Sequence, residues 1–219
     1  MEKTKIGVLI IITGASGAGK DAVMDNFLKS PDIRRLNLQK VVTCTDRPPR
    51  PGEVDGVNYH FLTPAKLKEL DANGELVEPI TQTGTSNKAT PKSEIERLLN
   101  AENLVWRIDP SRAAEIASGN FFDHLFPEYA AEMQKHTLVL FITAPKSVID
   151  DRRKSRDGKN YKPSEYAARD EQEKPYLEVL QKFATPIQNL DGRLNEAVSE
   201  SVESVVDFYN RIATSVTSI

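Results

Sequence analysis

Residues 14–20, Gly-Ala-Ser-Gly-Ala-Gly-Lys, have the glycine and lysine spacing of a phosphate-binding loop. An apolar run ends just before them at Thr13, and a segment with helical spacing follows. Glycines let successive backbone N–H groups point at an anion, and the following helix directs its positive dipole end to the same place. Lys20 adds a mobile positive charge for terminal phosphates. We therefore expect the triphosphate of a nucleotide to bind Gly14, Ala15, Ser16, Gly17, Ala18, Gly19, Lys20 and Asp21.

Asp21 departs from the usual pattern, in which a serine or threonine follows the lysine and ligates Mg²⁺. A carboxylate is also a hard oxygen ligand, so Asp21 is a candidate ligand for the Mg²⁺ that accompanies ATP. The other interpretation is an acidic residue in the first helical turn that complements the helix dipole. The sequence leaves both open.

A second candidate anion site lies in residues 43–63, a segment stiffened by prolines. Arg47 and Arg50 are three residues apart, and Tyr59 offers a hydroxyl at the far end of the same loop. Arginine presents a planar fork that binds phosphate with two hydrogen bonds. Composition alone equally allows a solvated surface turn with incidental arginines.

Alternation of strand and helix patterns around these segments predicts an α/β fold with a doubly wound parallel sheet. Expected strands are residues 8–13, 38–45, 103–109, 137–143 and 185–190. Expected helices are residues 20–30, 145–157 and about 164–183, a closing helix that contains Leu194 and Ile212, and two helices that start at Thr63-Pro64 and Thr90-Pro91. In such a fold the ligand lies at the carboxyl ends of the strands. Trp106 is expected in the core. For Phe121, Phe122 and Phe126 a place in the core is favoured over a lid or a surface for a partner.

Composition narrows the class of protein. The chain has 219 residues and a net charge of −3, which gives no indication of nucleic-acid or membrane-surface binding. Cys44 is the only cysteine, so an intrachain disulfide is excluded. No segment approaches the roughly 18–20 apolar residues of a membrane span, and the apolar N-terminal run continues into the loop as a strand. We expect a cytoplasmic protein.

The segment 45–61, TDRPPRPGEVDGVNYHF, resembles the GMP-binding signature of the guanylate kinase family, and residues 14–20 resemble that family's nucleotide loop. Residues 74–78 and 89–95 are similar to further family segments. The resemblance implies a P-loop kinase fold of one domain, residues 1–219, with ATP and GMP as substrates. It implies a core of residues 1–44, 101–148 and 184–219, a GMP-binding lobe of about 45–100 and a helical lid of about 149–183.

Position by position, the resemblance assigns the GMP phosphate to Arg47, Arg50 and Tyr59, and guanine recognition to Glu78. A carboxylate there accepts two hydrogen bonds from guanine that adenine cannot donate. Small hydroxyl positions of the same pocket match Thr43 and Thr90, and an acidic position near guanine and the metal matches Asp109. The resemblance also assigns a catalytic role to Lys20 and to three arginines of the lid, Arg152, Arg156 and Arg169. Their positive charges would neutralise the phosphoryl group during transfer.

Three positions depart from the family pattern. Asp21 replaces the loop hydroxyl, Lys88 stands where a phosphate-binding tyrosine is usual, and Arg107 replaces the first aspartate of a D-x-D strand end. Lysine still binds phosphate as a point charge. Arg107 is expected either near a phosphate or paired with Asp21.

These departures keep two other functions in view. The G-K-D loop and the S-R-A at 111–113 resemble ribose 1,5-bisphosphate kinases, small-molecule kinases related to the family. The departures also allow a noncatalytic guanylate kinase-like interaction module. The intact 45–61 signature and Glu78 argue against the first alternative. The complete phosphate loop and the lid arginines argue against the second.

Overall fold

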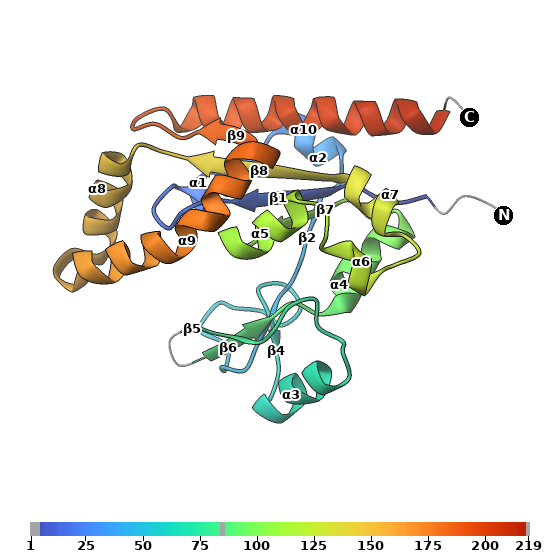
Figure 1. Ribbon diagram of the computed structural model, residues 1–219, viewed down its shortest axis with the longest axis horizontal. Helices are drawn as coiled ribbons and strands as arrows, with labels where there is room; N and C mark the ends of the chain where they lie inside the picture. The colour runs from blue at the N-terminus through green and yellow to red at the C-terminus, as the bar shows by residue number, and fades with distance from the viewer. Residues whose placement is uncertain (1–4, 84–85, 218–219) are drawn as a thin grey trace. The chain divides into compact units, whose positions relative to one another are not determined.

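The computed structural model describes residues 5–83 and 86–217, and the chain divides into two compact units (Figure 1). The smaller unit comprises Met1–Gly7 and Gln39–Leu104, and the larger comprises Val8–Leu38 and Val105–Ile219. Each unit has its own buried cluster of apolar side chains.

The larger unit is built on parallel strands in the order β7 (Leu104–Arg107), β1 (Leu9–Thr13), β8 (Thr137–Thr143) and β9 (Thr185–Gln188). β8 pairs in parallel with both β1 and β9. All five residues of β1 are buried, which is why the sequence there is a continuous apolar run rather than an alternating one. The strand pattern expected for a doubly wound sheet is therefore present.

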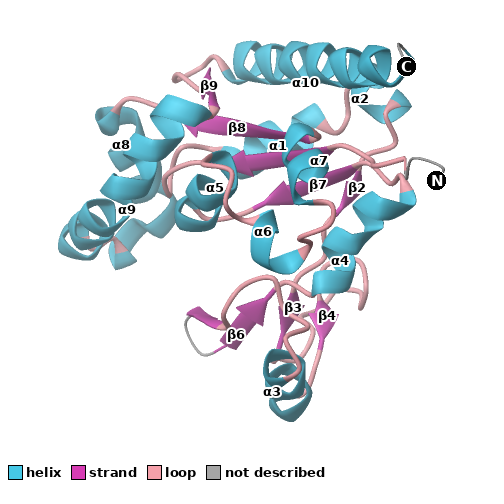
Figure 2. Ribbon diagram, turned by 45° about the vertical axis from the view of Figure 1, so that its right-hand side comes forward, coloured by secondary structure: helices cyan, strands magenta, loops and turns pink. Residues whose placement is uncertain are grey.

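Helices surround these strands (Figure 2). One group, α1 (Lys20–Phe27), α2 (Pro31–Arg35) and α10 (Leu194–Thr217), packs together through a core that includes Phe27, Ile33 and Val205. α5 (Pro110–Ala117) packs against α9 (Pro163–Phe183). The remaining helices of the unit are α6 (Phe122–Leu125), α7 (Ala130–Lys135), α8 (Lys146–Asp157) and the 3-10 turn η2 (Gly158–Asn160).

The smaller unit contains a four-stranded sheet in the order β4 (His60–Phe61), β3 (Cys44–Thr45), β6 (Ser86–Ala89) and β5 (Thr81–Thr83). β3 is parallel to β4 and antiparallel to β6. Its other elements are β2 (Gln39–Lys40), α3 (Pro64–Ala72), α4 (Lys92–Glu96) and the 3-10 turn η1 (Arg97–Asn100). Cys44, Leu67, Leu76 and Ala89 form its buried cluster.

Local signals placed several elements correctly. α3 begins after Thr63, whose hydroxyl accepts a hydrogen bond from the Lys66 N–H (3.1 Å) and caps the helix. The predicted aromatic core is confirmed, because Trp106, Phe121, Phe122 and Phe126 are all at most 5% exposed.

The prediction of one strand over 38–45 was wrong. The segment forms β2 and β3, which belong to different sheets. Between them the Val42 N–H donates to the Glu94 carboxylate (3.0 Å) instead of to a strand neighbour. The start signal at Thr90-Pro91 was also only partly right. α4 begins at Lys92 after Pro91, and the Thr90 hydroxyl donates to Glu78 rather than capping the helix.

None of the helices in the described part of the chain is long and apolar enough to cross a membrane.

Candidate functional site

The loop between β1 and α1 is fixed by its glycines. Gly17 has φ +89°, and a Cβ atom there would lie 3.1 Å from side-chain atoms of Ile149 and Arg153 on α8. Gly19 has φ +91°, and a Cβ atom there would lie 2.2 Å from the Asn189 amide nitrogen. That amide donates to the Ala18 carbonyl (2.8 Å). The glycines therefore allow both the left-handed backbone and the close packing that hold the loop against α8 and the end of β9.

Lys20 leads α1 and lies along the loop. Its ammonium donates to the carbonyls of Gly14 (2.7 Å) and Ala15 (2.9 Å). Burial, followed by the positive charge of Arg107, lowers the pKa of Lys20 from 10.5 to about 8. The charges of Asp21 and Glu173 oppose this shift. An anion bound at the loop would raise the pKa again, so the arrangement favours a phosphate ligand.

Asp21 forms an ion pair with Arg107. Of the two positions expected for Arg107, near a phosphate or beside Asp21, the structure shows the second. The Asp21 Oδ1 lies 2.9 Å from the Arg107 Nε, and the side chains are 75% and 43% exposed respectively. The carboxylate therefore stands in the first turn of α1, next to Lys20, with a guanidinium beside it.

The three arginines expected in the lid have different surroundings. Arg152 donates to the carbonyls of Ala18 (3.2 Å), Asn189 (3.1 Å) and Leu190 (3.3 Å). Arg156 is half-exposed and contacts Asp157 and the Tyr166 hydroxyl. Arg169 is also half-exposed, and its Nε donates to Glu173 (2.7 Å). Their contact with a phosphate stays a prediction.

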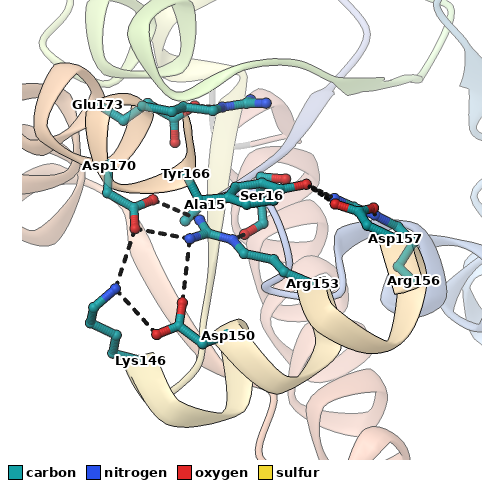
Figure 3. Close-up of polar contacts among 12 residues, drawn as sticks. Ala15, Ser16, Lys146, Asp150, Arg153, Arg156, Asp157, Tyr166, Asp170 and Glu173 are labelled. Atoms are coloured by element: carbon teal, nitrogen blue, oxygen red, sulfur yellow. Dashed lines mark hydrogen bonds and ion pairs between the residues drawn. The ribbon is translucent and has the colours of Figure 1, made fainter. Parts of the chain in front are cut away.

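Sequence reasoning missed Arg153, the neighbour of Arg152. Its side chain is fully buried, and its Nε donates to the Ser16 carbonyl in the loop (2.9 Å). Its two amino groups donate to both oxygens of Asp170 on α9 (2.9 and 2.6 Å), and its guanidinium lies 4.5 Å from the centre of the Tyr166 ring (Figure 3). Arg153 thus joins the phosphate loop to α8 and α9. The sequence does not distinguish Arg153 from its basic neighbours, because the face of α8 that carries Ile149 and Arg153 meets Gly17 only in the folded chain.

The smaller unit carries the second candidate anion site. We call its three cations and the two side chains that contact them the Arg47 cluster: Arg47, Arg50, Lys88, Glu53 and Tyr59. Arg47 donates through both amino groups to Glu53 (2.6 Å each), and these bonds lower the pKa of Glu53 to about 2. The Arg47 guanidinium lies 5.2 Å from the centre of the Tyr59 ring. The Lys88 ammonium donates to the Tyr59 hydroxyl (3.1 Å). The predicted Arg47, Tyr59 and Lys88 therefore meet in space.

Arg50 is exposed, and its backbone N–H donates to Glu53 (2.8 Å), so Glu53 fixes the loop at both arginines. Asp46 accepts from the backbone and side-chain N–H groups of Asn87 (2.7 and 2.6 Å), which holds β6 at the residue before Lys88. Glu53 and Asp46 therefore hold the segments that carry the cations. Two carboxylates do not neutralise all three cations of the cluster.

The residues expected to recognise the base fall into two groups. The Thr90 hydroxyl donates to Glu78 (2.7 Å), and the Thr43 carbonyl accepts from the His60 N–H (2.9 Å) in the same unit. Asp109 belongs to the larger unit, where it caps α5 by accepting from the N–H groups of Ser111 (2.9 Å) and Arg112 (3.2 Å). The capping contacts account for its position at the end of β7 without a ligand.

A parallel sheet whose strand β1 leads through a glycine loop into a lysine-headed helix defines a nucleotide-binding protein of the P-loop fold. The family model described as guanylate kinase matches residues 7–206. The chain belongs to the guanylate kinase family.

Curated relatives agree. A guanylate kinase of Clostridium perfringens is 33% identical over 153 residues, which is 68% of this chain and 68% of the relative. A guanylate kinase of a Nostoc species is 34% identical over 122 residues, 56% of each protein. The crystal structure of guanylate kinase from Anaplasma phagocytophilum covers 93% of this chain and 86% of its own, with a TM-score of 0.53 and 16% identity. At that identity the structural likeness shows the fold alone.

Proposed function

We propose that this protein transfers a phosphoryl group from ATP to GMP, giving ADP and GDP. Membership of a family of nucleoside monophosphate kinases supports this. One observation carries it to this chain: two cationic sites of different construction occur, the loop with Lys20 in the larger unit and the Arg47 cluster in the smaller. A kinase with two phosphorylated substrates needs both. We expect it to act in the cytoplasm.

In this proposal ATP binds the loop Gly14–Asp21 with its phosphates against the backbone N–H groups and Lys20. The exposed Asp21 carboxylate is a hard oxygen ligand, so its chemistry fits Mg²⁺. The metal would neutralise charge on the phosphates of ATP when bound.

GMP is proposed to place its phosphate among Arg47, Arg50, Tyr59 and Lys88. Glu53 already orients the Arg47 guanidinium through both of its amino groups, so little side-chain entropy is lost when a phosphate takes the place of the carboxylate. Glu78 is proposed to accept from guanine, aided by Thr43 and Thr90 of the same unit. The hydroxyl that Thr90 donates to Glu78 orients that carboxylate.

The attacking phosphate oxygen of GMP is already anionic, so the chain needs no general base. Catalysis then consists of positioning and charge neutralisation. Arg156 and Arg169 are half-exposed, so their guanidinium groups are accessible to a phosphate, which would compete with the carboxylates of Asp157 and Glu173. The carbonyl partners of Arg152 favour a role in holding the loop beside the end of β9.

The test is a coupled assay of ADP release with GMP, AMP, CMP, UMP and ribose 1,5-bisphosphate as acceptors. We expect turnover with GMP alone. Lys20→Met should lose orders of magnitude in kcat, whereas the exposed Lys29→Met on the same unit should not change it. Faster release with ribose 1,5-bisphosphate than with GMP would contradict the proposal. So would ATP hydrolysis that is independent of any acceptor.

A further inference from the structure

The contact between Asp21 and Arg107 has no evident structural purpose. Both side chains are well exposed, at 75% and 43%, and exposed ion pairs contribute little to stability. Neither belongs to the buried clusters of the unit. Its position is what distinguishes the pair, because Asp21 follows Lys20 in the first turn of α1 and Arg107 ends β7.

Arg107 also acts on the phosphate loop electrostatically. Its charge is close enough to the Lys20 ammonium to depress the pKa of that lysine, second only to burial. Lys20 and Arg107 are therefore close enough to repel one another, and Asp21, the residue after Lys20, is the carboxylate in contact with Arg107. A polyanion bound between two such cations offsets the repulsion between them.

The guanidinium has donors to spare for such an anion. Arginine carries five N–H donors, and the contact with Asp21 is made through Nε. Lys20 likewise uses two of its three ammonium donors on the loop carbonyls. Both side chains therefore retain N–H donors for a terminal phosphate at the loop.

We propose that Arg107 is a binding residue for the terminal phosphates of ATP, and that Asp21 holds its guanidinium beside the loop until the nucleotide arrives. The inference rests on the proposed ATP site. When ATP binds, its phosphates compete with Asp21 for the guanidinium, which releases the carboxylate for Mg²⁺. Arg107 supplies positive charge independently of the metal, so ATP should bind this protein appreciably without Mg²⁺.

The experiment is isothermal titration of ATP into the full chain, in excess EDTA and in excess Mg²⁺. Arg107→Gln should weaken metal-free ATP about tenfold or more, the value of one charge-assisted hydrogen bond, and should weaken MgATP less. Asp21→Asn should strengthen metal-free ATP, because the competing carboxylate is gone, and should weaken MgATP. The control Arg35→Gln removes an equally short ion pair, 2.9 Å from Asp32, whose arginine is more exposed than Arg107, and should change neither value.

Titration of ADP under the same conditions separates a phosphate contact from a general charge effect. A contact with the terminal phosphate makes the loss in Arg107→Gln larger for ATP than for ADP, whereas equal losses would overturn the inference. An effect of Arg107→Gln no larger than that of Arg35→Gln would overturn it as well. Failure of the proposed function looks different, because the assay of ADP release would then show no turnover specific to GMP, whereas the titrations with ATP would still depend on Arg107.

Discussion

Replacing Asp170 by asparagine leaves Arg153 charged and buried with a weaker partner. The Arg153 side chain is fully buried, and Asp170 accepts from both of its amino groups. Breaking a buried ion pair from one side costs about 3–5 kcal/mol. We expect a smaller loss than this, about 2–3 kcal/mol, because Asp170 is 30% exposed and Asp150 remains 3.6 Å from the guanidinium. For a chain of this size that corresponds to a melting temperature lower by about 4–12 °C.

The measurement is thermal and urea unfolding at pH 7, with Asp32→Asn as the matched control. Asp32 pairs with Arg35 at 2.9 Å, but the arginine is 77% exposed, so that loss should be at most about 1 kcal/mol. The double variant Arg153→Met/Asp170→Asn should be less destabilised than the two single losses added, because it leaves no buried charge without its partner. Equal melting temperatures for Asp170→Asn and Asp32→Asn would refute the reasoning, as would strict additivity in the double variant.

The same pair predicts a pH dependence with a definite sign. Hydrogen bonds from Arg153 hold the pKa of Asp170 below its usual value. A carboxyl whose pKa is lower in the folded state stabilises the fold at pH values above its unfolded pKa, about 4. That stabilisation is lost as the pH falls through the lowered folded value. Asp170→Asn should therefore lose less stability between pH 6 and pH 3 than the unaltered chain does.

Three further predictions concern single residues. The pKa of Lys20 is about 8, so ATP affinity should fall as the pH rises through 8 and the ammonium loses its charge; titrations at pH 7–10 would show this, and Lys20→Met should abolish the dependence. Burial raises the pKa of Cys44 to about 12, so iodoacetamide at pH 8 should alkylate the folded protein far more slowly than the urea-unfolded chain, and fast labelling of the folded form would contradict the burial. Glu78→Gln should reduce the preference in kcat/KM for GMP over AMP by about a hundredfold, and an unchanged preference would exclude Glu78 from base recognition.

The sequence was most informative where the structure is decided locally. The order of apolar strand, glycine loop and lysine-headed helix is contained in about twenty consecutive residues, so β1, the loop and α1 followed directly from the pattern. The cap at Thr63 is of the same kind, because its partner is the N–H of Lys66, three residues away. The pairing of Asp21 with Arg107 could be stated as one of two outcomes, since charge complementarity limits what an arginine at the end of β7 can contact.

Errors arose where a distant residue decides the local structure. Residues 38–45 have the composition of one strand, but the Val42 N–H is taken by Glu94, 52 positions further along the chain. Thr90 precedes a proline as Thr63 does, yet its hydroxyl is directed to Glu78 on another segment. In both cases a carboxylate outcompetes the local hydrogen-bond partner, and no pattern within a window of ten residues reveals where that carboxylate will lie.

The arginines of α8 show the same limit with a consequence for function. The sequence does not distinguish Arg152, Arg153 and Arg156, which lie in one basic segment. Of the three, only Arg153 has a fully buried side chain, and it is paired with Asp170. Arginine cannot discharge on burial as lysine can, so Arg153 must keep its acceptors, and one of these is the Ser16 carbonyl of the phosphate loop. A change on α9 that weakens Asp170 therefore reaches the loop through one side chain. We expect such changes to alter ATP affinity and stability together, whereas changes at the half-exposed Arg156 or Arg169 should alter turnover with a smaller effect on stability.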